Sequence, residues 1–186
     1  MKLVPTLALA AALLGAGAAQ AADWTVDPAK SRLGFTGSQA GSPFEGRFSR
    51  WTARIVFDPA NPTAGTAVVE IDMASAATGD LQKDESLPQA DWFDAKTFPQ
   101  ARFEATSFRP KGGNAFEAVG SLSIRGVKKD VVLPFTLDVA GPAAHAKGKL
   151  DLVRTDYGVG QGPWKAADMV ALNVAVTIDL VATSKP

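Results

Sequence analysis

The chain has 186 residues, with 19 Lys and Arg side chains, 19 Asp and Glu side chains, one His and no Cys. This length fits one domain, and ordinary shares of hydrophobic (46%) and charged (20%) residues exclude a disordered or low-complexity chain. The zero net charge argues against a nucleic-acid partner, and the absence of Cys excludes disulfides and thiol chemistry. The composition therefore favours a binding protein over an enzyme.

Residues 1–21 have the pattern of a secretory signal peptide. Lys2 gives a positive start, residues 3–18 are largely apolar, and Ala19-Gln20-Ala21 has the small-x-small cleavage pattern. A membrane anchor is the alternative, but the apolar run is shorter than the ~20 residues of a span. Cleavage removes Lys2 and leaves residues 22–186 as one domain with 18 basic and 19 acidic side chains, a net charge of −1. A secreted chain without Cys fits the bacterial periplasm.

The rest of the chain alternates between apolar and polar residues. The alternating runs follow in chain order at residues 24–36 (broken near Asp27-Pro28), 48–57, 66–73, 101–108, 116–124, 131–139, 144–153 and 170–180. A period of two is typical of half-buried antiparallel strands. Turn signals such as Lys111-Gly-Gly-Asn114 separate the runs. The sequence therefore predicts an all-β protein of about eight antiparallel strands, closed into a barrel because closure removes exposed edges.

Residues 78–98 interrupt this pattern, because they are polar and do not alternate. They carry five carboxylates: Asp80, Asp84, Glu85, Asp91 and Asp94. We expect a short helix and loop that crosses outside the barrel or over one of its ends. The carboxylates lack the spacing and the glycine of a calcium loop, so a solvated face is predicted rather than a metal site.

No catalytic arrangement stands out in the sequence. Ser121 and Ser123 have no His in a nearby motif, and His145 lies on the polar parity of its strand. The glycines of residues 158–162 precede Pro163 and lie outside any βαβ pattern, so they do not form a dinucleotide loop. Asp and Glu are numerous, but no pair of carboxylates is singled out for acid–base catalysis. We therefore predict no enzyme activity.

The apolar parity of the strands contains many small residues. They are Ala101, Ala105, Ala118, Gly120, Ala144, Ala146 and Gly148. An eight-stranded barrel can hold a small ligand when its inward side chains do not fill it. The alternative is that these residues interleave with bulky side chains from opposite strands. The alternation itself leaves a hollow and a packed interior equally open.

Several short motifs occur in the order and spacing of one protein family. They are Trp24-Thr-Val-Asp-Pro-Ala-Lys-Ser31 with Phe35, Phe44-Glu-Gly-Arg-Phe48, Ile55-Val-Phe-Asp-Pro59, Asp91-Trp-Phe-Asp94, Phe98-Pro-Gln-Ala-Arg-Phe103, Gly120-Ser-Leu-Ser-Ile-Arg-Gly126 and Arg154-Thr-Asp-Tyr-Gly158. With these motifs, residues 22–186 resemble the YceI family of secreted bacterial proteins. The resemblance implies a lipocalin-like barrel that holds a polyisoprenoid, such as a quinone tail or a prenyl phosphate, and so favours the hollow interior.

The sequence departs from the common family pattern after Phe35. Many members have a His-containing segment there, whereas residues 36–43 of this chain contain no His. This variant resembles the branch associated with membrane b-type cytochromes. The resemblance therefore implies an isoprenoid quinone as ligand and such a cytochrome as partner, and no other cofactor.

An isoprenoid chain needs an apolar enclosure rather than reactive groups, because burial contributes ~25 cal/mol per Å². The predicted lining residues are Phe35, Phe103, Phe116, Leu122, Phe135, Leu150 and Val174. Three aromatic residues beside loops are predicted to lie at the entrance of the barrel: Trp92, Phe93 and Trp164. Arg154 and Arg125 are the candidates for a polar head group. For each of these residues a plain packing or structural role is the alternative.

Two functions follow from these patterns. The first is a periplasmic carrier or sequestering protein for a polyisoprenoid lipid. The alternative is a stress-response or interaction protein with a packed barrel and no lipid ligand. Val132 and Val153 are candidates for the edge of a homodimer, although scattered exposed valines are ordinary on monomers.

Overall fold

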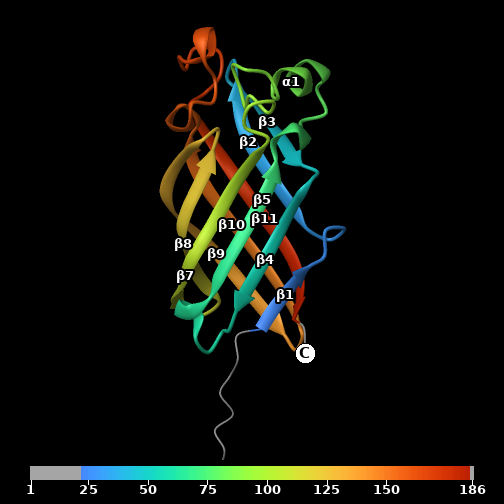
Figure 1. Ribbon diagram of the computed structural model, residues 1–186, viewed down its shortest axis with the longest axis vertical. Helices are drawn as coiled ribbons and strands as arrows, with labels where there is room; N and C mark the ends of the chain where they lie inside the picture. The colour runs from blue at the N-terminus through green and yellow to red at the C-terminus, as the bar shows by residue number, and fades with distance from the viewer. Residues whose placement is uncertain (1–21, 185–186) are drawn as a thin grey trace, which may run out of the picture.

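A computed structural model describes residues 22–184 of the chain, and the predicted signal peptide lies outside these residues. The strands run obliquely around a tall barrel (Figure 1). Helix α1 and two long loops lie at the upper end in this view, whereas β1 and the last residues of β11 lie at the lower end. We call these the loop end and the β1 end.

Eleven strand segments form one closed antiparallel sheet. They are β1 (Ala22–Val26), β2 (Arg32–Gln39), β3 (Ser42–Phe48), β4 (Trp51–Phe57), β5 (Thr66–Asp72), β6 (Ala76–Ala77), β7 (Gln100–Gly112), β8 (Ala115–Ile124), β9 (Val127–Ala140), β10 (Ala143–Val153) and β11 (Asn173–Ser184). Their order in the sheet is β1-β4-β5-β7-β8-β9-β10-β11-β2-β3-β6, and pairing of β1 with β11 closes the barrel.

The barrel has eight strands because three of them are each built from two segments. β1 and β2 both pair with β11, β3 runs on into β4, and β5 runs on into β6. The break between β1 and β2 is a tight turn at Asp27, whose carboxylate accepts from the Ala29 N–H at 3.0 Å. The predicted all-β barrel of about eight strands and the predicted break near Asp27-Pro28 are therefore confirmed.

A buried hydroxyl stabilises the other two breaks. Ser75 is buried and lies in a 3₁₀ turn, η2 (Met73–Ser75), between β5 and β6. Its Oγ accepts from the Arg50 N–H at 3.1 Å and donates to the Asp72 carbonyl at 2.7 Å. One side chain thus satisfies backbone groups of both interrupted strands, which would otherwise be left unpaired.

The sequence pattern did not predict β3. This segment contains Pro43 and Gly46, which are rare in strands, and its partner β2 contains Gly37. The structure shows the reason for the glycines, because the ring of Phe44 covers Gly37 and the ring of Phe35 covers Gly46. Cross-strand aromatic rings replace the side chains that the glycines lack.

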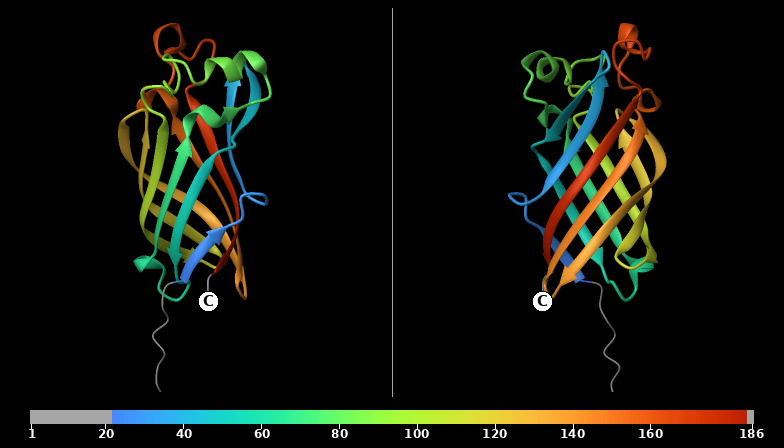
Figure 2. Two further views of the ribbon diagram at one scale, coloured as in Figure 1. Left: turned by 45° about the vertical axis from the view of Figure 1, so that its right-hand side comes forward. Right: turned by 180° about the vertical axis from the view of Figure 1, so that it is seen from behind.

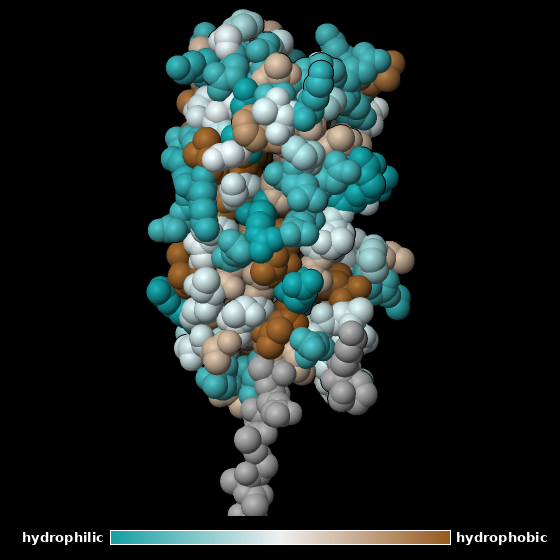
Figure 3. All heavy atoms as spheres, viewed as in Figure 1, coloured by the Kyte–Doolittle hydropathy of each residue, from teal (hydrophilic) through white to brown (hydrophobic). Residues whose placement is uncertain are grey.

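The remaining helical segments are short. Besides η2, they are α1 (Leu81–Ser86), η1 (Pro62–Ala64), η3 (Arg154–Tyr157) and η4 (Gly162–Trp164). α1 lies in the polar segment 78–98, as predicted. None of the helices within residues 22–184 has the length and apolarity to cross a membrane. On the face shown in Figure 3, hydrophobic residues form small groups separated by hydrophilic ones.

Candidate functional site

The interior of the barrel contains two adjoining apolar cavities. The larger has a volume of about 150 Å³ and is lined by side chains from strands around the barrel. The second, of about 110 Å³, lies between the larger cavity and the loops. Ile71, Leu122 and Val176 line both cavities, so the two cavities adjoin; we call the pair the lumen, which extends towards the loop end.

The small inward residues have two different roles. Ala105 is buried (3% exposed) and packs in the aromatic cluster near the β1 end without lining a cavity, whereas Ala67 and Ala118 are buried in the same cluster and also line the larger cavity. Ala146 is only half-buried and lines the larger cavity. Gly120 allows a close approach of β7, because a Cβ at this position would lie 1.8 Å from the Glu104 carbonyl oxygen. Small residues that only pack and small residues that line a cavity therefore both occur in the interior.

Aromatic rings close the β1 end. The ring centroid of Phe57 lies 5.1 Å from that of Phe108 and 5.8 Å from that of Phe116, in edge-to-face geometry. The Phe135 ring stacks on Phe116 at 5.7 Å. The Trp24 Nε1–H donates to the Phe57 carbonyl at 3.0 Å, so the indole is also fixed in this cluster. Edge-to-face and stacked pairs of this kind add to the stability that area burial provides.

Two loops, residues 78–98 and 154–172, form a cap over the loop end. The Asp91 carbonyl accepts from the N–H groups of Gly160 (2.9 Å) and Gln161 (2.7 Å), which joins the two loops. The Trp92 and Trp164 rings lie 5.6 Å apart. Arg125, from the β8–β9 turn, donates to the Trp92 carbonyl at 2.7 Å. The cap is thus held by backbone hydrogen bonds and by a pair of indoles.

Arg154 is the central side chain of the cap. It is only 4% exposed, and its guanidinium donates to the carbonyls of Val159, Trp164, Ala166, Val170 and Ala171. The guanidinium carbon lies 5.5 Å from the Trp92 ring. Burial lowers the pKa of Arg154, yet an arginine remains charged at any physiological pH. Because it has no carboxylate partner within residues 22–184, it contributes an uncompensated positive charge beside the second cavity.

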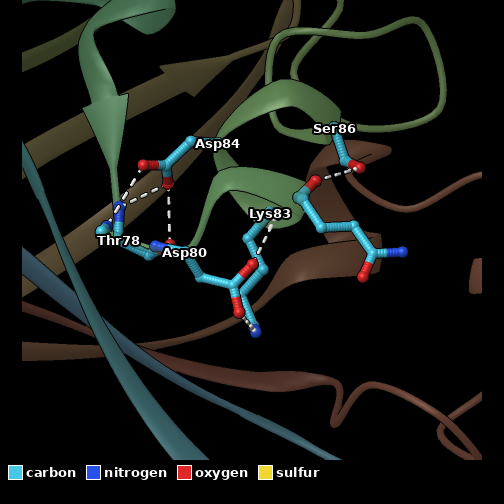
Figure 4. Close-up of polar contacts among 7 residues, drawn as sticks. Thr78, Asp80, Lys83, Asp84 and Ser86 are labelled. Atoms are coloured by element: carbon cyan, nitrogen blue, oxygen red, sulfur yellow. Dashed lines mark hydrogen bonds and ion pairs between the residues drawn. The ribbon is translucent and has the colours of Figure 1, made fainter.

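The segment around α1 is organised by two carboxylates (Figure 4). Asp84 Oδ1 accepts from the Thr78 N–H at 2.6 Å and from the Thr78 hydroxyl at 2.7 Å, and Oδ2 accepts from the Gly79 N–H at 3.1 Å. Asp80 caps α1 by accepting from the Lys83 N–H at 3.1 Å. These bonds lower the pKa of Asp84, the largest contribution coming from the Thr78 N–H. In the part of the chain that the structure describes, no three His, Asp or Glu side chains gather as a metal site.

Most of the residues singled out from the sequence border the lumen. Phe103, Leu122, Phe135 and Leu150 line the larger cavity, and the second is lined by Phe35, Trp92, Phe93, Leu122, Arg154 and Val174. Phe116 lies in the aromatic cluster at the β1 end, and Trp164 lies in the cap against Trp92. Arg154 and Arg125 both donate to backbone carbonyls, which gives each a structural role. Their part in holding a head group stays a prediction.

Sequence reasoning missed several lining residues. Trp24, Leu33, Trp51, Ile55, Val69 and Ile71 line the larger cavity. All six belong to the first half of the barrel, where the interrupted strands obscure the alternation. The inward parity of each run was the available signal, because residues of one parity share a face.

Comparison with known proteins gives the same picture over nearly the whole chain. The family model of the YceI-like domain matches residues 24–182 of this chain. The UPF0312 protein of Pseudomonas savastanoi pv. phaseolicola is 30% identical over 183 residues, which cover 94% of this chain and 95% of that protein. The UPF0312 protein of Pseudomonas syringae pv. tomato is 32% identical over 172 residues, which cover 87% of this chain and 90% of the relative.

Solved structures share the barrel. BcnA of Burkholderia cenocepacia is 39% identical, with a TM-score of 0.82 over 85% of this chain and 99% of BcnA. A polyisoprenoid binding domain from Saccharophagus degradans, 16% identical, has a TM-score of 0.68 over 88% of this chain and 99% of that domain, and shows the fold alone. From the domain match, the relatives and the eight-stranded barrel together, this chain belongs to the YceI family.

Proposed function

We propose that this protein binds the chain of a polyisoprenoid lipid in its barrel lumen and carries it through the periplasm. The observation that carries this proposal is the lumen itself, two adjoining cavities of which the larger is lined by apolar side chains throughout. Enclosure of an apolar chain releases ~25 cal/mol for each Å² removed from water, so the enclosure supplies the affinity without any reactive group. The polyisoprenoid-binding description of the Saccharophagus degradans domain, which has the same fold, supports the choice of ligand class.

The geometry favours one orientation of the ligand. Aromatic rings occupy the β1 end, and no polar side chain lines the larger cavity, so a polar head group would be left without partners there. The charge of Arg154 and the indoles of Trp92 and Trp164 lie at the other end. The isoprenoid chain of the ligand therefore points towards the β1 end, and its quinone or phosphate head group lies near the cap.

The remaining parts of the proposal rest on the sequence. The signal-peptide pattern and the absence of Cys favour the periplasm, and the lack of a catalytic arrangement favours binding without catalysis. The family resemblance suggests an isoprenoid quinone as the ligand and a membrane b-type cytochrome as the protein that exchanges it. A packed barrel that acts only through its surface is the competing function. The two adjoining cavities argue against it, because native cores of this kind are usually filled to crystal-like density.

Lipid extraction from purified protein tests the proposal. The protein is expressed in a bacterium with its own periplasm, purified without detergent, extracted with organic solvent and examined by mass spectrometry. We expect an isoprenoid lipid in amounts that approach one per chain. Absence of any such lipid in repeated preparations, together with no binding of added ubiquinone, would instead support the packed-barrel function.

A matched pair of variants ties binding to the lumen. Ala146 faces the larger cavity and Lys147, the next residue of β10, faces outwards. Ala146→Phe should fill the cavity and remove most of the extracted lipid, whereas Lys147→Phe should leave it unchanged. Equal lipid content in both variants would show that the lipid binds outside the lumen.

A further inference from the structure

β9 and β10 part from one another before either strand ends. They are paired only from Ala140 with Ala143 to Phe135 with Gly148. β9 has a further segment, residues 127–134, that stays paired with β8, and β10 has a further segment, residues 149–153, that stays paired with β11. The structure assigns no pairing between these two segments. We call the line between them the seam; β9 curves away from β10 towards the loop end (Figure 2, right).

A proline ends the ladder at the start of the seam. The Leu137 N–H donates to the Asn114 carbonyl at 2.8 Å, so odd-numbered residues of β9 direct their N–H groups towards β8. Even-numbered residues direct theirs towards β10, because successive N–H groups alternate along a strand. Pro134 is the next even-numbered residue beyond Phe135 and has no N–H. The ladder to β10 therefore lacks its donor at the residue where pairing stops.

Apolar side chains close the seam from the inside. Leu133 of β9 and Leu150 of β10 line the larger cavity, and Leu152 lines the second. Val131 packs with Leu150 and Leu152 against one buried cluster. The seam thus borders both cavities, and side-chain packing takes the place of the backbone hydrogen bonds that join the other strands.

The outer rim of the seam carries exposed valines together with exposed charged side chains (Lys128, Asp130, Lys149 and Asp151), and among the described residues only one ion pair spans it. Val127, Val132 and Val153 are exposed at this rim. Lys129 Nζ on β9 lies 3.0 Å from Asp156 Oδ2 in η3, and both side chains are about half exposed. An exposed pair of this kind contributes little to stability. Exposed valines on both sides of the seam give an apolar chain a surface to contact before it enters.

The two ends of the barrel are closed more firmly than the seam. Opening the β1 end would separate four packed phenylalanine rings. Opening the loop end would break the hydrogen bonds of the Asp91 carbonyl with the N–H groups of residues 160 and 161. It would also take the Arg154 guanidinium away from the backbone carbonyls to which it donates, and these carbonyls would then have no donor. Buried polar groups that lose their partners are costly. Opening the seam separates apolar side chains, one exposed ion pair and the contact of Lys129 with the Tyr157 ring, whose centroid lies 5.9 Å from Lys129 Nζ.

We propose that the seam is a lateral portal through which the isoprenoid chain enters and leaves the lumen, with Lys129 and Asp156 as its latch. This inference rests on the proposed function, because it describes the route of the same ligand. A flexible apolar chain can pass sideways between two strands, while its head group stays in water near the cap. The portal also explains how a long chain reaches a lumen whose two ends are both covered.

Reversible cross-linking tests the portal, and the absence of Cys from the chain makes engineered pairs specific. Continuing the β9–β10 register places Val132 opposite Asp151, both exposed. The variant V132C/D151C, joined by a bismaleimide with a reducible linker, holds the seam shut. The control K149C/T177C joins outward residues of the paired strands β10 and β11. A third variant, D91C/Q161C, holds the two cap loops together.

The measurement is the rate of ubiquinone uptake from, and release to, vesicles of phosphatidylcholine. Quenching of tryptophan fluorescence reports occupancy, because Trp24 and Trp51 line the larger cavity. We expect the seam cross-link to slow uptake and release by about tenfold or more, which is about 1.4 kcal/mol in the barrier. Reduction of the linker should restore both rates, and the β10–β11 control should exchange at the wild-type rate. Lys129→Met, which removes the latch, should accelerate both rates.

The outcomes separate this inference from the proposed function. If the wild-type protein binds ubiquinone but the seam cross-link leaves exchange unchanged, the portal is wrong and the lumen still binds the lipid. Slow exchange only in the cap cross-link would likewise overturn the portal in favour of entry at the loop end. If the wild-type protein binds no ubiquinone, the proposed function fails and the portal fails with it.

Discussion

The ring of Phe35 lies directly over the backbone of Gly46, its partner on the neighbouring strand β3. A Cβ at Gly46 would lie 2.2 Å from Cζ of this ring, closer than two carbon atoms that are not bonded can approach. The ring also contacts Phe48 at a centroid distance of 5.3 Å and lines the second cavity. Because Gly46 has no side chain, the Phe35 ring can lie against the wall of the barrel and is not displaced into the second cavity.

Gly46→Ala should displace the Phe35 ring into the second cavity. We expect the free energy of unfolding to fall by about 1–3 kcal/mol, as in other overpacked cores. Chemical denaturation measures this change. Adding Phe35→Leu should recover part of the loss, because the smaller side chain leaves room for the methyl group. Glu45→Ala, at an exposed position of the same strand, is the control and should have little effect. Equal losses with and without Phe35→Leu would show that the ring is not the cause.

Arg154 should be important for stability whether or not lipid is bound. Arg154→Ala leaves buried carbonyls of residues 159–171 without donors, and we expect a loss of about 3 kcal/mol or more in the free energy of unfolding. Arg154→Lys keeps the charge but cannot reach all the carbonyls, so its loss should be intermediate. Thermal unfolding of lipid-free protein measures both. A stable lipid-free Arg154→Ala variant would contradict this structural role and leave the head group as the main partner of Arg154.

The aromatic cluster at the β1 end should account for much of the stability of that end. Phe108 is buried and contacts Phe57 and Phe135. Phe108→Ala should lower the free energy of unfolding by about 3–5 kcal/mol, because it leaves a cavity that the barrel wall cannot fill. Val139→Ala, at an exposed position of β9, should change stability by less than about 0.5 kcal/mol. If both variants lose the same amount in urea denaturation, the cluster does not close this end as described.

The segment before α1 should loosen in acid through Asp84. The Thr78 N–H, the Thr78 hydroxyl and the Gly79 N–H hold the pKa of Asp84 below its usual value of about 3.9. A carboxyl whose folded-state pKa is lowered stabilises the fold above the unfolded-state value, and this contribution is lost as the pH falls through the folded-state pKa. Hydrogen exchange of the Thr78 and Gly79 amides should therefore accelerate, after correction for intrinsic rates, only below about pH 4.

Asp84→Asn provides the control for this pH dependence. The amide keeps one acceptor oxygen but presents an N–H₂ group to a backbone donor, so both amides should exchange faster already at neutral pH. The difference between the variant and the wild-type protein should shrink as the wild-type carboxyl becomes protonated. A difference that stays constant down to the acid range would show that another group controls the segment.

The sequence by itself determined the strands whose alternation is uninterrupted. The runs that contain β5 and β7–β11 are evident because one face of each strand meets an apolar interior and the other meets water. The same reasoning placed Phe103, Leu122 and Leu150 on the inner face. The alternation is harder to recognise in the first half of the barrel, where the strands are interrupted. The sequence does not predict β3, because Pro43 and Gly46 are typical of loops and the sequence does not show that the Phe35 ring lies over Gly46.

Only the tertiary structure decided how the inner face divides into filled and empty space. Alternation says which residues point inwards but not which side chains from opposite strands meet, so Ala105 and Ala146 look alike in the sequence. The closed sheet packs Ala105 against aromatic rings and leaves Ala146 beside a cavity. The seam is likewise a tertiary feature: Pro134 is visible in the sequence, but its missing N–H matters only because the fold directs it towards β10. Local patterns determine the strands, and the register between strands determines the lumen.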